Sequence, residues 1–252
     1  MKDVPLRALP RIFLPGADMT EPFELPSDEA DKLRKVLRMS TGDRLAVLPD
    51  DGSLWVCELQ GKRAIPIRQE WPDTEPAVAV TLAQALPKGD RLETILRMGT
   101  EIGVARFVLF PAERSVVRWE TQKLESKLKR LRAIVREAAE QSFRGLLPTI
   151  EVQDSLHRIL QAEEDAIVLS EREGIEKTLW EVANDRLERG TKAITIIVGP
   201  EGGWAKAELL DIGERGVTLG PLVLRTDTAG TAAAAIVLMG AYAASFRNSV
   251  RR

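Results

Sequence analysis

Cysteine and histidine are nearly absent from this chain of 252 residues, which has one of each. With one cysteine, Cys57, no internal disulfide is possible, and we expect a reducing compartment, the cytoplasm. With one histidine, His157, a histidine-rich metal site and a Ser-His-Asp triad are both disfavoured, so no metal is expected. Cys57 lies in a segment that alternates like a strand and is expected in the core, whereas His157 is expected on the surface.

Long apolar runs are also missing, so no membrane partner is expected. The most apolar segment, 229–244, is rich in alanine and too short to span a bilayer, which predicts a buried helix. The first residues lack the basic start and apolar run of a secretion signal. The composition, 44% apolar and 29% charged, is typical of a globular protein, and the net charge of −2 does not by itself indicate a nucleic-acid partner.

The common glycine motifs of nucleotide-binding folds are absent. The chain has no G-x-x-x-x-G-K-[ST] loop and no G-x-G-x-x-G after a first strand. Its glycine-rich turn comes late, after residue 198, so a ligand site would belong to the C-terminal part of the chain, unlike a Rossmann site.

What is present divides into two parts. Residues 1–73 predict a small β-rich module, with strands at 11–14, 44–48 and 53–59, a hairpin turn at 49–52 and one helix at 27–39. In that helix Leu33, Val36 and Leu37 are expected to share one face, with Arg34, Lys35 and Arg38 outside it. Segment 71–76, rich in proline and acid, is typical of a linker, and residues 74–252 then form the second domain.

The second part alternates strands with helices, which predicts an α/β domain with a mostly parallel sheet and helices on both of its faces. The expected strands are 78–86, 107–110, 166–169, 194–198, 217–219 and 222–224. A helix with one apolar stripe is expected over 121–141.

The strand at 194–198 ends abruptly at a turn with three glycines, Gly199-Pro200-Glu201-Gly202-Gly203, and a helix is expected from Trp204 to about Ile212. Glycine allows a close approach of the backbone to a ligand, and open α/β sheets bind ligands at the carboxyl ends of their strands. The pattern fits a ligand loop and an ordinary strand-to-helix turn equally well.

A second unusual segment, 219–230, holds a glycine turn and then Arg225, Thr226, Asp227 and Thr228 before a long helix. Any of the last three could serve as the N-cap of that helix. Arg225 is not explained by capping, because the helix dipole disfavours a cation there, so we expect it to have an anionic partner. Two such turns within thirty residues make a better candidate site than either alone.

Together, these segments resemble a family. Gly199-Pro200-Glu201-Gly202-Gly203-Trp204, Leu219-Gly220 and Leu224-Arg225-Thr226-Asp227-Thr228-Ala229 are similar to the C-terminal motifs of the RsmE family of 16S ribosomal RNA uracil-N3 methyltransferases, in the SPOUT superfamily. The likeness extends to Lys88-Gly89-Asp90-Arg91, Glu113-Arg114-Ser115-Val116-Val117 and Glu137-Ala138-Ala139-Glu140-Gln141-Ser142, and to Arg11-Ile12-Phe13 near the start.

The resemblance implies a C-terminal SPOUT-type α/β domain with a deep trefoil knot, a small N-terminal PUA-like β-barrel that binds RNA, and a homodimer. It also implies S-adenosyl-L-methionine as cofactor and 16S ribosomal RNA of the small subunit as partner. Carried over by position, the cofactor residues are Leu169, Ser170, Glu171, Gly199, Pro200, Glu201, Gly202, Gly203, Leu219, Gly220, Leu224, Arg225, Thr226, Thr228 and Ala229.

Methyl transfer to uracil N3 requires loss of a proton and stabilisation of negative charge on the flanking carbonyl groups. We expect Arg225 to stabilise this charge, and Asp227 or Glu201 to accept the proton. The alternatives are that Glu201 only braces the glycine turn and that Asp227 only caps the helix.

RNA contact is expected at Arg11, Arg34, Arg38, Arg114 and Arg118, and also at Arg144, which match the family pattern. The cations of helix 121–141 are more typical of a solvated face. Four departures from the family concern RNA contact and catalysis: Asp227 in place of glutamate, Met98 in place of lysine, Leu146 in place of a basic residue, and no histidine in the N-terminal helix.

Two other functions remain open at this point. One is a SPOUT methyltransferase that acts on another RNA position, such as a ribose 2′-hydroxyl. The other is a non-catalytic ribosome-assembly factor that binds RNA and has kept the fold.

Overall fold

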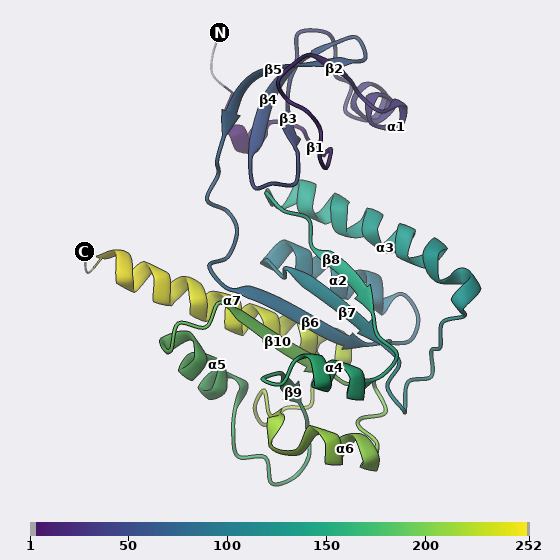
Figure 1. Ribbon diagram of the computed structural model, residues 1–252, viewed down its shortest axis with the longest axis vertical. Helices are drawn as coiled ribbons and strands as arrows, with labels where there is room; N and C mark the ends of the chain where they lie inside the picture. Colours follow the sequence, from purple (N-terminus) through teal and green to yellow (C-terminus); the bar gives the residue numbers. More distant parts are fainter. Residues whose placement is uncertain (1–3, 251–252) are drawn as a thin grey trace. The chain divides into compact units, whose positions relative to one another are not determined.

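The computed structural model describes residues 4–250, with side chains through Ser245, and the chain divides into two compact units. The first unit runs to Glu75 and also includes Ala139–Leu147, and the second unit holds Pro76–Ala138 and the chain from Pro148 onward (Figure 1). The return of the chain to the first unit after the linker is a feature that the sequence pattern does not predict.

The first unit is a five-stranded sheet in the order β1-β3-β4-β5-β2. A 3-10 turn, η1 (Leu6–Ala8), precedes its strands β1 (Arg11–Phe13), β2 (Phe23–Glu24), β3 (Arg44–Leu48), β4 (Leu54–Gln60) and β5 (Arg63–Glu70). The predicted hairpin is confirmed, because β3 and β4 pair antiparallel. β1 runs parallel to β3, and β2 and β5 are additional strands that pair with each other.

The helix predicted at 27–39 is shorter and changes its winding. It begins as α1 (Ser27–Asp31) and continues as a wider π-helical turn, η2 (Lys32–Val36). Leu33 lies in the core, but Val36 is 72% exposed and Leu37 is exposed as well. The expectation of one shared buried face was wrong, because a π turn shifts the i, i+3 and i+4 spacing on which it rested.

Glu140 fastens the returning segment to the rest of the first unit. Its carboxylate accepts hydrogen bonds from the Phe13 N–H (3.0 Å) and from Lys32 Nζ (2.6 Å). The Arg11 Nε donates to the backbone oxygen of Glu140 (2.6 Å), and the Arg11 guanidinium lies 4.8 Å from the ring centre of Phe143. A buried carboxylate is thereby paired from two elements, as its desolvation requires.

The second unit confirms the predicted α/β architecture, with a six-stranded sheet in the order β11-β9-β10-β6-β7-β8. Every pair of neighbours in it is parallel. The strands are β6 (Ala79–Ala85), β7 (Arg106–Phe110), β8 (Thr149–Val152), β9 (Ile167–Leu169), β10 (Ala193–Val198) and β11 (Gly216–Val217).

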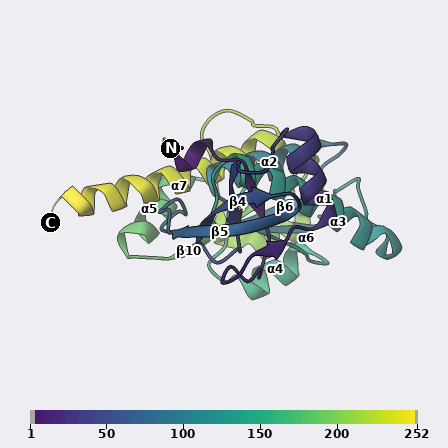
Figure 2. The same cartoon turned by 90° about the horizontal axis from the view of Figure 1, so that it is seen from above.

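Helices cover both faces of this sheet, because successive strand residues point to opposite sides. Val80, Leu82, Ile194 and Ile196 share one core with residues of α2, α3, α5 and α7. Ala83, Val168 and Ile197 share the other core with α4 and α6, so that α2 and α7 lie on one side of β6 and β10 and α4 and α6 lie on the other (Figure 2). The helices are α2 (Arg91–Ile102), α3 (Thr121–Gln141), α4 (Leu156–Ala162), α5 (Leu179–Glu188), α6 (Lys206–Ile212) and α7 (Thr226–Val250), with a 3-10 turn, η3 (Gly213–Arg215), after α6.

The strand predicted at 222–224 does not form. Segment 220–225 is irregular, and Leu222 and Val223 are 76% and 79% exposed. β11 ends at Val217 and is the edge strand of the sheet, and 222–224 pairs with no strand of the described residues. A run of apolar residues alone cannot distinguish a strand from an exposed loop.

Helix α7 is longer than the sequence pattern suggests. The stretch Thr226–Ser245 is long and apolar enough to cross a membrane by length and composition, and half of its most apolar window is buried in the protein. One face, with Ala233, Ala234, Val237 and Leu238, belongs to the core of the second unit. The predicted buried helix is therefore confirmed on this face. The argument that the segment is too short to span a bilayer was wrong, because the helix is longer than 229–244.

Cys57 and His157 lie where the sequence predicts them. Cys57 is buried among the core residues of the first unit. His157, near the start of α4, is exposed, and its Nδ1 lies 3.2 Å from a carboxylate oxygen of Asp211.

The burial of Cys57 leads to a testable prediction about its thiol, because burial raises the pKa of Cys57 to about 12. Reactivity requires the thiolate, so iodoacetamide at pH 8 should leave the native protein unmodified and should alkylate it once in guanidinium chloride. Intact mass measures both. Rapid alkylation of the native protein would contradict the position of Cys57 in the core.

Candidate active site

The carboxyl ends of β9, β10 and β11 meet at one edge of the sheet, and the loops that follow them enclose a pocket of about 570 Å³ in the second unit. This size is typical of a site for a small molecule. The pocket brings together these predicted cofactor residues: Leu169, Ser170, Glu171, Gly199, Pro200, Glu201, Gly203, Leu219, Leu224, Arg225, Thr226 and Ala229.

Three predicted cofactor residues, Gly202, Gly220 and Thr228, are not part of the pocket lining. Nine further residues do line it: Arg91, Arg172, Val198, Trp204, Leu209, Val217, Thr218, Leu222 and Val223. The site is therefore broader than the matched motifs, and its additional members are mostly apolar side chains whose position depends on the fold.

Trp204 joins two walls of the pocket. Its indole Nε1 donates to the backbone oxygen of Leu169 (2.8 Å), and its ring stacks against Phe110 with 6.4 Å between the ring centres. A Cβ at Gly199 would lie 3.0 Å from the same indole, so the glycine turn passes close to it. Trp204 thus holds the end of β9 beside the end of β10, and the Leu169 oxygen is already engaged.

Two glycines of the loops around the pocket, Gly203 and Gly220, have left-handed backbone conformations. Gly203 has a φ of 66° and Gly220 has a φ of 127°, and a Cβ at either position would meet nothing within 4 Å. These left-handed conformations, and not crowding, are what favour glycine there.

Glu201 is engaged by the start of α2. Its Oε1 accepts hydrogen bonds from the Lys88 N–H (3.1 Å) and from Arg91 (2.7 Å). Burial alone would raise the pKa of the Glu201 carboxyl, but hydrogen bonds from its own N–H and from that of Lys88, together with the Arg91 guanidinium, hold that pKa below its ordinary value. This arrangement ties the glycine turn to the loop after β6.

The anionic partner expected for Arg225 is Asp227, since Arg225 Nε lies 3.5 Å from Asp227 Oδ1. The Arg225 side chain is largely exposed and lines the pocket. Asp227 Oδ1 is buried and accepts no hydrogen bond from the residues that the structure describes. The two charged groups proposed for catalysis therefore lie together at the start of α7.

The capping prediction for α7 was wrong. Thr226, Asp227 and Thr228 all fall within the first turn, because the helix begins at Thr226. The Thr226 hydroxyl instead donates to the backbone oxygen of Gly199 (2.7 Å), which links the glycine turn to the start of α7.

The arginines expected to bind RNA lie in both units. In the first unit, Arg34 is exposed and paired with Asp31 (3.3 Å), and Arg38 is exposed with a φ of 55°. In the second unit, Arg118 is exposed, and the exposed Arg114 donates to the backbone oxygen of Gly202 (3.2 Å). Arg114 therefore reaches the glycine turn itself.

Arg144 differs from the other arginines. Its side chain is only 5% exposed, and its Nε and NH2 donate to the carboxylate of Glu75 at 2.7–3.0 Å. Glu75 also accepts from the Gly145 N–H (2.8 Å). The guanidinium is directed to the end of the linker and not to solvent, which favours an anchoring role over the expected RNA contact.

Three of the six basic side chains of α3 form ion pairs with acidic side chains. Lys123 pairs with Glu120, Arg130 with Glu93 and Arg132 with Glu125. The interpretation of this helix as a solvated face agrees with these pairs. Met98 and Leu146, at two of the departures from the family, are both exposed.

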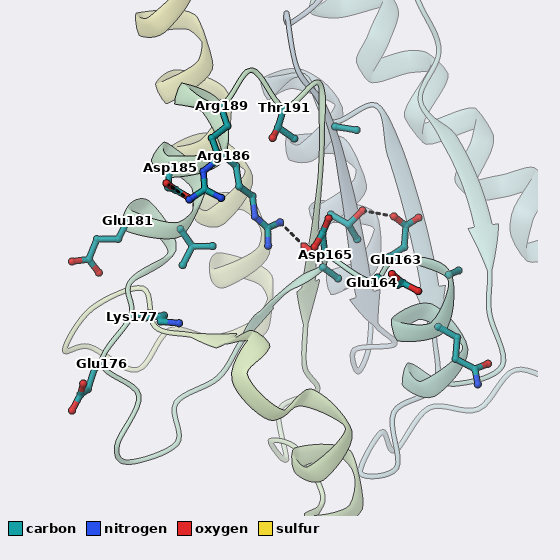
Figure 3. A pocket seen from close by; sticks show the side chains of 16 residues that line it. Glu163, Glu164, Asp165, Glu176, Lys177, Glu181, Asp185, Arg186, Arg189 and Thr191 are labelled. Atoms are coloured by element: carbon teal, nitrogen blue, oxygen red, sulfur yellow. Dashed lines mark hydrogen bonds and ion pairs between the residues drawn. The ribbon is translucent and has the colours of Figure 1, made fainter.

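A larger hollow of about 1110 Å³ lies at the opposite, amino-terminal ends of β9 and β10. Its charged residues are engaged with neighbours: Arg189 pairs with Asp185, as Figure 3 shows, and Arg186 donates to the Asp165 backbone oxygen. Glu163 accepts a hydrogen bond from the Thr195 hydroxyl. It contains no glycine turn and lies at the edge that parallel sheets rarely use for ligands. We therefore assign the candidate site to the smaller pocket.

Comparison with known proteins agrees with this assignment. Residues 74–238 match the family model of an RNA methyltransferase domain. The chain is 36% identical to ribosomal RNA small subunit methyltransferase E of Bacillus subtilis, over 82% of this chain and 86% of the relative. It is 33% identical to the protein of the same name from Mycobacterium tuberculosis, over 82% of each chain.

Solved structures give the same result. The ribosomal RNA small subunit methyltransferase E of Neisseria gonorrhoeae, solved with S-adenosyl methionine, superposes with a TM-score of 0.77 at 27% identity, covering 90% of this chain and 95% of that one. A Legionella pneumophila methyltransferase in complex with the same cofactor gives a TM-score of 0.78 at 25% identity, covering 94% and 98%.

The anchoring role of Arg144 predicts a stability effect. Arg144→Ala leaves Glu75 without its charged partner, and breaking this largely buried ion pair should lower the free energy of unfolding by about 3 kcal/mol. Urea denaturation measures this loss, with the exposed Arg34→Ala as control, which should change stability by less than about 0.5 kcal/mol. If the stability of Arg144→Ala is unchanged, Arg144 is not an anchor, and RNA contact becomes the better explanation of its role.

Proposed function

Because the chain belongs to the RNA methyltransferase family, we propose that it transfers a methyl group from S-adenosyl-L-methionine to N3 of a uridine in 16S ribosomal RNA. The coarser function, a methyltransferase of small-subunit ribosomal RNA that uses this cofactor, follows from the relatives. The single observation that carries the finer proposal is the pair of Arg225, which lines the pocket, and Asp227, which lies next to it at the start of α7 but outside the pocket lining.

The residues present fit this cofactor. The pocket combines apolar walls from Leu169, Leu219 and Leu224 with the glycine turn, and S-adenosylmethionine has both an apolar purine face and polar edges. We propose that the walls hold the adenine, that backbone groups of Gly199, Pro200, Glu201, Gly203 and Leu219 bind its edge, and that Ser170, Glu171, Thr226 and Ala229 complete the site. When bound, the cofactor supplies an electrophilic methyl group on its sulfonium.

Arg225 has the properties that the reaction needs from an electrostatic stabiliser. Loss of the N3 proton spreads negative charge onto the two neighbouring uracil carbonyl oxygens. A fixed cation stabilises such developing charge, and Arg225 is held at the helix start by Asp227 while most of its guanidinium stays exposed to a substrate.

We propose Asp227, and not Glu201, as the group that accepts the N3 proton. Glu201 already accepts two hydrogen bonds, and its lowered pKa makes it a weak base. The Asp227 side chain is 23% exposed, and its buried Oδ1 accepts no hydrogen bond from the described residues, so this carboxylate keeps acceptor capacity for the uracil N3–H. Glu201 then serves as the brace of the glycine turn.

For the RNA, we propose that Arg11, Arg34 and Arg38 of the first unit and Arg114 and Arg118 of the second unit bind phosphates. Arg34, Arg38, Arg114 and Arg118 are exposed, and phosphate contacts position a nucleic acid without reading its sequence. Arg144 is left out of this set because of its burial.

The remaining properties expected from the family are proposals as well: a trefoil knot in the second domain (74–252), a PUA-like barrel in the first (1–73), a homodimer, and a cytoplasmic location. A homodimer is supported by the exposed apolar side chains Met239 and Tyr242 on α7 and Leu222 and Val223 beside the pocket.

The direct test uses purified protein, S-adenosylmethionine with a labelled methyl group, and 16S RNA either free or in small subunits. We expect labelled 3-methyluridine after digestion to nucleosides, measured by mass spectrometry. Label in a 2′-O-methyl nucleoside would assign a different RNA position. Cofactor binding with no labelled RNA would favour a non-catalytic factor, and no cofactor binding would reject both enzymatic functions.

The assignment of the base gives a second prediction. Asp227→Asn should lower the methyl-transfer rate roughly 100-fold or more while cofactor affinity stays within a few-fold, since general-base catalysis contributes at least that much. Glu201→Gln should instead weaken cofactor binding and leave the shape of the pH–rate profile unchanged between about pH 5 and 9. The profile should not change because the pKa of Glu201 is lowered from its ordinary value of 4.5. Glu201 is therefore ionised throughout this pH range, and its ion pair with Arg91 is lost only when the pH falls below 4.5.

Stopped assays over this pH range, with calorimetric titration of the cofactor, measure both effects. If Glu201→Gln removes a limb of the pH profile, the assignment of the two carboxylates is reversed.

A further inference from the structure

Gln84 is a fully buried polar residue that no part of the proposed reaction uses. It lies near the end of β6, with 0% of its surface exposed, and it pairs in register with Val198, the last residue of β10 before the glycine turn. A buried amide is costly unless it makes hydrogen bonds, so its retention in the core calls for an explanation.

The amide of Gln84 is directed to the start of α7. Its Nε2 donates to the Thr226 hydroxyl (3.1 Å) and to the backbone oxygen of Ala85 (3.0 Å). The Thr226 hydroxyl then donates to the Gly199 oxygen (2.7 Å). These bonds form a chain from β6 through α7 to the glycine turn, which we call the Gln84 relay: Gln84, Thr226 and Gly199.

The relay also fixes the direction of the hydroxyl. The Thr226 oxygen accepts a hydrogen bond from Gln84, so its one proton is free to be donated to the Gly199 oxygen. The hydroxyl thus acts as acceptor toward one partner and as donor toward the other. Both segments that the relay joins line the pocket, the glycine turn from β10 and the segment 224–229. Gln84 itself does not line it.

Gly230 is part of the same arrangement. A Cβ at position 230 would lie 2.9 Å from Gln84 Oε1, so a larger residue there would displace the amide. That oxygen is buried and accepts no hydrogen bond from the described residues. The site therefore tolerates an unsatisfied acceptor, which costs stability, in order to place Nε2 against Thr226.

We propose that Gln84 is a positioning residue for the cofactor site: through Thr226 it sets the distance between the glycine turn and the segment 224–229, and thereby the affinity for S-adenosylmethionine. The inference rests on the proposed cofactor site but not on the identity of the RNA product. A relay of this kind acts by preorganisation, because the two walls are held in place before the ligand binds.

The plain alternative is that the relay only stabilises the fold. The two accounts differ in what a variant loses. Since Gln84 and Gly230 are outside the pocket lining, a loss of cofactor affinity in their variants cannot arise from a lost ligand contact.

The test compares Gln84→Met, Gly230→Ala and Thr226→Val with Thr226→Ser, which keeps the hydroxyl. Thr231→Val is the matched control, because Thr231 is a buried threonine of the same helix whose hydroxyl bonds only to the Asp227 backbone oxygen among the contacts described. Calorimetric titration with S-adenosylmethionine gives the affinity, and thermal unfolding gives the stability.

We expect Gln84→Met, Gly230→Ala and Thr226→Val each to weaken cofactor affinity roughly tenfold, the effect of about one hydrogen bond. Thr231→Val should stay within about threefold, and Thr226→Ser should recover most of the affinity that Thr226→Val loses, because it keeps the hydroxyl. The double variant Gln84→Met with Thr226→Val should bind no more weakly than the weaker single variant, because residues of one network are coupled.

Lowered melting temperature with unchanged affinity would overturn the proposal, and so would independent, additive losses. If the wild type itself does not bind the cofactor, the proposed function fails first. If the wild type binds and the Gln84 and Gly230 variants bind equally well, only the relay fails.

Discussion

The parallel pairing of β6, β9, β10 and β11 is the constraint on which the site depends. It brings the carboxyl ends of strands that are far apart in sequence to one edge of the sheet. The loop after β9, the glycine turn after β10 and the segment after β11 can then form one pocket. Trp204 and Thr226 fasten these loops to one another through backbone oxygens, so the pocket is a consequence of sheet topology and of two hydrogen bonds.

The charged groups around the pocket divide into two pairs with different tasks. Glu201 and Arg91 form a pair that joins the glycine turn to the start of α2. Asp227 and Arg225 form a longer pair at the start of α7, in which the Arg225 side chain is largely exposed. The first pair is closed by further hydrogen bonds and suits bracing, whereas the second leaves donor and acceptor capacity for a substrate.

Much of the second unit could be predicted from its sequence. β10 and the glycine turn stand out because a buried parallel strand is a short run of branched apolar residues, and α3 stands out because its apolar residues recur at helical spacing. The family motifs then predicted most of the residues that line the pocket. All of these signals are local, so they can be recognised in a single sequence.

The errors and omissions have physical reasons too. Val36 was expected to be buried, but the π turn η2 changes the spacing of its helix. The run 222–224 has the composition of a strand, but it pairs with no strand of the described residues and is exposed, a difference that composition alone does not reveal. Arg144 and Gln84 depend on partners far away in sequence, Glu75 and Thr226, so nothing in their own neighbourhood could identify them as an anchor and a relay.

Hydrogen–deuterium exchange with and without S-adenosylmethionine tests most directly the claim that the two glycine-containing segments form one cofactor site. Bound cofactor should slow exchange in residues 169–172, 199–204 and 219–229 together. Exchange at 163–166 and 185–191, around the larger hollow, should not change. Protection at the larger hollow, or at only one of the three pocket segments, would contradict the account.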